Sequence, residues 1–274
     1  MISNKECKFT FVTANLRSQN DDDRENSFNN RSELLKAFFT ERNFDIVAVQ
    51  ELSQDGLKRI EDCFEDYCAA VFPRDLSGED EAPAIFFKVS KFELMGMEAR
   101  ALSDTDQVVG SRFLDQSICP RSYHLLRLRD KETRKQFFVI NTHFDHEGEG
   151  ARLEAAKQII ARIKDLEKRD NQEYIAYKRD SEIIPLIFCG DLNEDKDAAG
   201  VQYLENSKII KDITPNLDFS YHGFKPEEEK ENTRIDFIYI TEGIEVEKSS
   251  AEIIESYKDR LISDHRFIAA TFKI

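Results

Sequence analysis

The sequence predicts an α/β protein. Short apolar runs alternate with longer stretches in which apolar residues recur every three to four positions, the pattern of strands alternating with amphipathic helices. Asp45–Gln50 (DIVAVQ) is nearly all apolar, as expected of a strand that is buried on both faces. The chain has 274 residues, 40% of them apolar, which suffices for one large α/β domain, and it shows no internal repeat.

The first half of the chain contains two predicted helices. Lys8–Asn15 is rich in β-branched and aromatic residues and predicts a strand before them. Arg31–Arg42 has an apolar stripe and predicts an amphipathic helix that Ser32 caps. Gln54–Phe64 predicts a second helix. Further strands are predicted at Ala84–Lys88, Lys91–Ala101, Tyr123–Arg129 and Gln136–His143.

The second half contains the longest predicted helix, Gly150–Lys168, whose apolar residues lie along one stripe. Ile183–Cys189 predicts a buried strand that continues directly into the polar turn Gly190–Asn193. The remaining predicted strands are Ile235–Ile240, Val246–Ile254 and Phe267–Phe272.

Two segments, Ser18–Asn30 and Lys225–Asn232, are predicted as solvated loops because they contain the charge runs DDD and EEEKE. The strand patterns on both sides of each loop are alike, so neither loop indicates a domain boundary. We therefore expect a single domain over residues 1–274.

The net charge of −15 argues against a long nucleic-acid duplex as the partner, because binding many phosphates requires a basic face. No stretch approaches the ~18 apolar residues of a membrane span, and residues 1–30 lack the pattern of a signal peptide. The five cysteines lack zinc-site spacing and fit buried thiols in a reducing compartment. We expect an intracellular, cytoplasmic protein without a membrane span.

Polar residues gather at the predicted strand ends, where functional groups of α/β sheets commonly lie. Taken alone, each has an ordinary explanation: an Asp or Asn after Gly is a common turn former, Glu51 could be an exposed strand end, and His143 a hydrogen-bonded core histidine. The residues are Asn15, Gln50, Glu51, His143, Asp191, Asn193, Asp236 and Ser263–Asp264–His265.

Asp236 has no such simple explanation. It lies inside the apolar run TRIDFIYI and is predicted to be buried. An ionised buried carboxylate must be paired or hydrogen-bonded, and His265 is the predicted partner.

Six motifs resemble, in order, the signature motifs of the endonuclease/exonuclease/phosphatase family, which includes deoxyribonuclease I. The resemblance covers residues 9–272 and implies a four-layered α/β sandwich of two packed mixed β-sheets flanked by helices. It also implies a Mg²⁺-dependent phosphoester hydrolase, with Mn²⁺ as an alternative ion. The motifs are TANLR, AVQEL, NTHFDHEG, IFCGDLNED, RIDFIYI and SDHRF.

The resemblance also implies the metal ligands. Glu51 is the principal ligand, with Asn15 and Asp264 close by, directly or through water. Mg²⁺ is a hard cation that prefers such oxygen ligands and keeps several waters.

The same resemblance implies the catalytic roles. Asp191 accepts a proton from the attacking water, and Asn193 holds that base or the phosphate. His265, made more cationic by Asp236, stabilises charge on the phosphoryl oxygens. His143 hydrogen-bonds the same phosphate or assists the leaving group. The metal serves as Lewis acid and template, without a covalent intermediate.

Three further residues lie in motifs that resemble those of one subgroup of the family. His146 and His222 either line the substrate pocket or are exposed loop histidines. Arg121, in CPRSYHL, is predicted to contact the substrate phosphate rather than to be an ordinary surface arginine. Specificity is expected to lie in residues 74–82, 104–120 and 216–232.

The substrate class stays open between two main alternatives. A nuclease or other phosphodiesterase is placed slightly ahead of a phosphatase acting on a small molecule or a phosphoinositide. A lipid phosphodiesterase should need an exposed apolar surface, and none is evident in the sequence. A catalytically silent binding protein is disfavoured because the catalytic set is complete. The expected partner is thus a phosphoester: a nucleic acid, a nucleotide or a small phosphorylated molecule.

Overall fold

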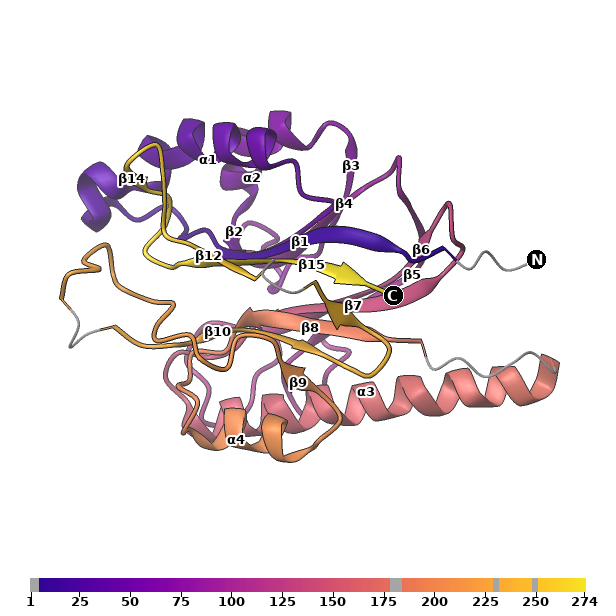
Figure 1. Ribbon diagram of the computed structural model, residues 1–274. Helices are drawn as coiled ribbons and strands as arrows, with labels where there is room; N and C mark the ends of the chain where they lie inside the picture. The colour runs from indigo at the N-terminus through magenta and orange to yellow at the C-terminus, as the bar shows by residue number, and fades with distance from the viewer. Residues whose placement is uncertain (1–4, 178–183, 229–231, 248–250) are drawn as a thin grey trace.

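Two β-sheets pack face to face, and helices cover the outer face of each, so the molecule has four layers (Figure 1). This confirms the predicted four-layered α/β sandwich. The computed structural model describes residues 5–177, 184–228, 232–247 and 251–274, with only the backbone described over 169–177.

The first sheet has seven strands in the order β11–β15–β1–β2–β4–β3, with β12 also paired to β15. Only β1 and β2 run parallel, and the other described pairs are antiparallel. The strands are β1 (Lys8–Asn15), β2 (Ile46–Leu52), β3 (Tyr67–Val71), β4 (Ala82–Lys88), β11 (Glu245–Val246), β12 (Glu252–Ile254) and β15 (Phe267–Lys273).

The second sheet has six strands in the order β5–β6–β7–β8–β10–β9. Here β7 and β8 form the parallel pair. The strands are β5 (Phe92–Ala101), β6 (Ser122–Asp130), β7 (Gln136–His143), β8 (Leu186–Asp191), β9 (Lys211–Asp212) and β10 (Asp236–Ile240). A separate short hairpin joins β13 (Ser256–Tyr257) to β14 (Arg260–Leu261).

The helices divide between the two outer layers. α1 (Phe28–Arg42) and α2 (Gln54–Ile60) cover the first sheet, followed by the 3₁₀ turn η2 (Glu61–Phe64). α3 (Glu149–Tyr177) and α4 (Ala199–Asn206) cover the second sheet, as Figure 1 shows. A further 3₁₀ segment, η1 (Asp21–Asn26), precedes α1.

Side-chain alternation explains why the central strands are apolar throughout. In β7, Phe137 and Val139 belong to the core between the two sheets, whereas Phe138 and Ile140 belong to the core beneath α3. Phe9 of the first sheet stacks on Phe137 of the second, with ring centroids 4.7 Å apart. Because successive side chains point to opposite faces, a strand that is buried on both faces needs apolar residues at odd and even positions alike.

The structure corrects the predicted start of α1. The helix begins at Phe28 after Ser27, and the hydroxyl of Ser32 donates to Asn29 O inside the helix, so Ser32 is not the cap. Because Phe28 is buried, it extends the apolar stripe one turn before the predicted start. The predicted loop 18–30 therefore contains η1 and the first turn of α1.

Other elements also differ from the prediction. The short strand β3 and the helix α4 were missed, and α3 continues beyond the predicted residue 168 to Tyr177. The predicted strand 246–254 is represented by β11 and β12, which pair with opposite ends of β15. Residues 183 and 248–250 of the predicted strands lie outside the described residues.

Two simpler expectations concern the cysteines and the membrane. Cys7 and Cys189 are buried, whereas Cys63, Cys68 and Cys119 are only half-buried, so the expected burial holds for two of the five thiols. Within the described ranges, no helix combines the length and the apolar character needed to cross a membrane.

Candidate active site

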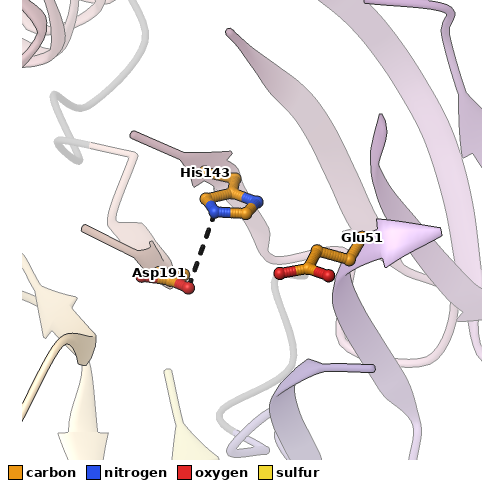
Figure 2. Close-up of side chains that lie close together, drawn as sticks. All are labelled: Glu51, His143 and Asp191. Atoms are coloured by element: carbon orange, nitrogen blue, oxygen red, sulfur yellow. Dashed lines mark ion pairs between the residues drawn. The ribbon is translucent and has the colours of Figure 1, made fainter. Parts of the chain in front are cut away.

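The ends of three strands bring Glu51, His143 and Asp191 together (Figure 2). One ligand atom of each residue lies within 4.8 Å of the others. Glu51 comes from β2 in the first sheet, and His143 and Asp191 are register partners on β7 and β8 in the second. The site therefore spans both sheets at one edge of the sandwich.

Asp191 is a buried carboxyl group with fixed hydrogen-bond partners. Its oxygens accept bonds from Asn15 Nδ2 at 2.9 Å and from the backbone N–H of Asn193 at 2.8 Å. Burial, reinforced by the negative charge of Asp236, raises the pKa of Asp191 to about 7. A general base is most effective when its pKa lies near the working pH.

Gly190 makes the turn before Asp191 possible. Its φ is 144°, and a Cβ atom there would lie 2.0 Å from the carbonyl oxygen of Thr142 on the neighbouring strand. The chain then turns at Asn193, which has φ 50°. The backbone conformation of the GDLN motif therefore places the Asp191 side chain at the end of the strand.

The variant Gly190→Ala is expected to lower the free energy of unfolding by about 1–3 kcal/mol, because an added methyl group in a packed site forces backbone shifts. Urea denaturation measures this loss. Gly96→Ala is the matched control, since a Cβ there would meet nothing within 4 Å. Equal stability of the two variants would contradict the steric explanation.

His265 and Asp236 form the predicted buried pair. Nδ1 of His265 lies 2.7 Å from Oδ2 of Asp236, which confirms the pairing inferred from the sequence. Burial by itself lowers the pKa of His265, but the charge of Asp236 and the hydrogen bond to it outweigh burial and raise the pKa to about 10. The cationic ring directs Nε2 towards Asp191, whose Oδ2 lies 3.8 Å away.

His143 is neutral by contrast. Burial, followed by the positive charges of Arg121 and Arg74, holds its pKa well below the ordinary value. Nδ2 of Asn193 donates to Phe144 O at 3.1 Å and lies 3.0 Å from Nε2 of His143. Because an amide nitrogen donates, Nε2 accepts, and the proton of His143 sits on Nδ1. The 3.6 Å approach of Nε2 to Asp191 in Figure 2 is therefore not a charged pair.

Asn15 connects the two carboxylates. Its Nδ2 donates to Glu51 at 3.0 Å and to Asp191 at 2.9 Å, while its Oδ1 accepts from the backbone N–H of Arg17. The amide oxygen keeps a second lone pair. Asn15 therefore orients the two carboxylates, and its contact with a cation, directly or through water, stays a prediction.

The donor set fits a divalent cation. Glu51 and Asp191 both lie within hydrogen-bond distance of one amide nitrogen, and Asp264 is buried nearby. Burial acts to raise the pKa of Glu51, but bonds from Ser18 N–H and Asn15 and the charge of His265 outweigh it, so Glu51 stays ionised. Burial, with the charge of Glu51, raises the pKa of Asp264. Crowded carboxylate oxygens are the ligands that Mg²⁺ prefers.

Arg121 lies beside this cluster and is buried rather than on the surface. Only 4% of its side chain is exposed, and it lines a narrow cavity with Glu51 and His143. Its Nη2 lies 3.1 Å from Nδ1 of His146. Its Nε and Nη1 have no hydrogen-bond partner in the part of the chain that the structure describes.

Two residues of this cavity were missed by the sequence analysis. Arg74 is held by Glu81 at 2.8 Å and by Asp80 at 2.9 Å, and both Arg74 and Glu81 line the cavity. They fall in the predicted specificity loop 74–82, but charged loop residues resemble solvated surface. Only the burial of Arg74 reveals the difference.

The structure locates the two remaining predicted histidines differently. His146 is half-exposed beside Arg121. His222 is only 2% exposed, so it is not an exposed loop histidine, and its backbone N–H donates to Asp264 O at 2.9 Å. Contact of either ring with a substrate stays a prediction.

Exposed apolar side chains lie on two of the predicted specificity loops. Loops 74–82 and 104–120 approach each other at Gly110 and Asp75. Their exposed apolar side chains are Leu76, Val108, Val109, Leu114 and Ile118. Singly exposed apolar side chains are common on protein surfaces, so they do not by themselves form an apolar binding surface.

Known protein families and structures resemble this chain over almost its whole length. The sequence model of the "Endonuclease/Exonuclease/phosphatase family" matches residues 12–265. No curated protein sequence is similar enough to count as a match.

Solved structures of similar fold cover almost the whole chain. An endonuclease/exonuclease/phosphatase from Bacteroides vulgatus is 26% identical, with a TM-score of 0.83 over 97% of this chain and 98% of that one. A mannosyl-6-phosphatase from Bacteroides thetaiotaomicron is 25% identical, with a TM-score of 0.77 over 96% and 99%. The human Nocturnin catalytic domain, 17% identical with a TM-score of 0.70 over 97% and 93%, shares the fold.

Proposed function

Because the chain belongs to the endonuclease/exonuclease/phosphatase family, we propose that it is a Mg²⁺-dependent phosphatase that hydrolyses a small phosphorylated molecule. The observation that carries this proposal is Arg121, whose buried Nε and Nη1 lie beside Glu51 and His143 and make no hydrogen bond to a described residue. Their contacts with carboxylates are long, 3.8 Å from Nη1 to Glu81 and 4.0 Å from Nε to Asp145. A terminal phosphoryl group carries more charge and one more free oxygen than an internal phosphodiester. A buried guanidinium therefore stabilises a terminal phosphoryl group more than an internal phosphodiester.

Three other described arginines near the site are paired or buried, which disfavours a track for nucleic acid. Arg17 pairs with Asp23 at 2.9 Å, Arg74 pairs with Asp80 at 2.9 Å, and Arg31 is fully buried. A long polyanion needs exposed cations that its phosphates can reach. This arrangement moves the phosphatase ahead of the nuclease that the sequence analysis slightly favoured.

A phosphodiesterase is the second candidate. The exposed apolar side chains of Leu76, Leu114 and Ile118 favour a substrate with a base or an acyl chain in its leaving group. Such a substrate would be a short single strand, a nucleotide diester or a phospholipid.

The proposed reaction begins at Asp191. Asn15 and the backbone of Asn193 hold its carboxylate, which takes a proton from the water that attacks phosphorus. A pKa of about 7 leaves a useful fraction of this base ionised at neutral pH. The Asn193 side chain fixes His143 in the tautomer that presents Nε2 as an acceptor and Nδ1–H as a donor.

The phosphoryl group would lie between cationic groups. His265, held cationic by Asp236, donates to a phosphoryl oxygen as negative charge develops there. Arg121 donates to another, and neutral His143 donates to the phosphate or the leaving group. Glu51, with Asn15 and Asp264 directly or through water, would hold the cation. That cation supplies Lewis-acid and template chemistry when bound.

A hydrolysis panel tests the proposal. Wild-type protein with Mg²⁺ or Mn²⁺, and with EDTA, is assayed on p-nitrophenyl phosphate, mannose 6-phosphate, an inositol polyphosphate, bis-p-nitrophenyl phosphate, a single-stranded oligonucleotide and sphingomyelin. We expect the monoesters to be cleaved with the highest kcat/KM, and EDTA to abolish the activity. Faster cleavage of the diesters would establish the second candidate. Activity that is unchanged in EDTA would overturn the metal-dependent mechanism.

The variant Arg121→Gln is expected to lower kcat/KM for the monoester by about 10- to 100-fold, because a hydrogen bond to a charged group contributes roughly 1.5–3 kcal/mol. The loss for the diester should be smaller. Arg129→Gln is the matched control, since it removes the same charge at the other end of β6. Equal losses on both substrates would show that Arg121 does not select a terminal phosphoryl group.

A further inference from the structure

A bulge in β2 aims the proposed metal ligand Glu51. Val49 pairs with Ala84 of β4, but Leu52 pairs with Ala82, so Gln50 and Glu51 together oppose a single residue, Pro83. Proline has no N–H to donate, which interrupts the ladder at this point. Glu51 takes φ 58°, a left-handed conformation that is uncommon for a residue with a side chain. Bulges of this kind redirect a side chain.

The other sheet supplies the group that holds this bulge. Asn141 of β7 is fully buried between the sheets. Its Nδ2 donates to Val49 O at 2.8 Å and to Ala84 O at 2.9 Å, the paired residues on which the regular ladder ends. Its Oδ1 accepts from Nε2 of Gln50, the first bulged residue, at 2.6 Å. One amide therefore contacts both strands at the bulge.

An amide suits this position better than other side chains of similar size. Carbonyl oxygens only accept, so the two bonds to Val49 and Ala84 need a group with two N–H donors. A carboxylate would place lone pairs against both carbonyls. An apolar side chain would leave buried polar groups unpaired, which is unfavourable.

Asn141 also connects the two halves of the site. Asn141 and His143 lie two positions apart on β7, so their side chains leave the same face of the strand. On the other side of the bulge, Gln50 pairs with Asn15 in the parallel ladder between β1 and β2. A displacement of the bulge would therefore move Glu51 and Asn15 relative to His143.

We propose that Asn141 is a positioning residue that holds the β2 bulge and thereby sets Glu51 at the distance from His143 and Asp191 that metal binding needs. Asn141 itself touches neither the cation nor the substrate. This inference rests on the proposed function, because it concerns the carboxylate that would hold the cation.

The experiment measures Mn²⁺ binding to the full chain by electron paramagnetic resonance, together with the Mg²⁺ concentration for half-maximal activity. Asn141→Ala should weaken Mn²⁺ binding by about 10- to 100-fold, as the loss of a group that orients a ligand commonly does. Val139→Ala is the matched control, because Val139 is buried in the same core and faces the same way. It should lose stability but keep the wild-type affinity for Mn²⁺.

Equal Mn²⁺ affinity of Asn141→Ala and Val139→Ala would overturn the inference. If Asn141→Ala does not fold, Gln50→Met decides, since it keeps the Asn141 bonds to the backbone and removes the bond from Gln50 to Asn141, together with the bond from Gln50 to Thr13. Thr13→Val, which removes only the second of these bonds, is its control. Gln50→Met should weaken Mn²⁺ binding by a smaller factor, and binding no weaker than in Thr13→Val would overturn the proposal. Failure of the wild type to bind Mn²⁺ would overturn the proposed function as well, so the two failures are distinguishable.

Discussion

Replacing Asp191 with asparagine is expected to lower kcat by about 10²- to 10⁴-fold, the usual contribution of a general base. The fold and metal binding should remain close to those of the wild type. Asparagine keeps the shape of the side chain, and its single amide oxygen can accept one of the two bonds, from Asn15 or from Asn193. It cannot take a proton from water. Steady-state kinetics on the best substrate of the panel, at saturating Mg²⁺, measures the loss.

The same variant should reveal the stability cost of the base. The pKa of Asp191 is raised on folding, so its ionised form destabilises the native state as pH rises from the ordinary value through about 7. In EDTA, the free energy of unfolding of Asp191→Asn should therefore increase relative to that of the wild type as the pH rises from 5 to 8. Urea denaturation at both pH values measures this difference.

Asp197→Asn is a suitable control for both measurements, because Asp197 is an exposed carboxylate a short distance along the chain. It should keep the wild-type rate and show no such pH-dependent gain. A near-normal rate for Asp191→Asn would show that another group is the base.

The second large effect is expected when the cationic side chain of His265 is removed. His265→Ala is expected to lower kcat by about 10²- to 10³-fold, as the loss of one donor to a developing negative charge commonly does. Asp236→Asn should also impair the rate, though less, because asparagine can still accept the Nδ1–H bond but carries no charge. The two changes should not add, since Asp236 acts through His265.

The pH profile of Asp236→Asn gives a more specific readout. Without the carboxylate, burial dominates and the pKa of His265 falls from about 10, so the cation is lost at a lower pH. The charge of Asp236 also raises the pKa of Asp191, so its removal lets the base ionise earlier. Both limbs of the pH–rate profile should therefore move towards acid.

A double-mutant cycle with His265→Ala and Asp236→Asn is the decisive comparison. We expect the double variant to be no slower than His265→Ala alone by more than a small factor. Independent, additive losses would show that Asp236 does not act by orienting and charging His265.

Some of this site could be predicted residue by residue. Asp236 lies in an apolar run, and a buried carboxylate needs a partner, which pointed to His265 before any coordinates. The 2.7 Å bond between them confirms that inference. Strand ends were equally predictable, because apolar runs that stop at Glu51, His143 and Asp191 identify where strands leave the core.

Other features could not be predicted because they depend on contacts between distant segments. Asn141 reads as one polar residue near the end of an apolar strand, and its partners, Val49 and Ala84, lie on the other sheet. Arg74 resembles a surface arginine until its burial distinguishes it. The motif implied that Asn15 lies close to the metal, but not that its amide nitrogen donates to both Glu51 and Asp191.

The α/β class, the apolar strands and helices that build it, and the polar residues at the strand ends could all be predicted from the chain alone, because hydrophobic periodicity is a local property of the sequence. Folding was needed to show how those ends meet across two sheets, which protonation states they take, and which arginine keeps donors without a hydrogen bond. These outcomes depend on distances, on burial and on neighbouring charges that arise when segments far apart in the chain pack together.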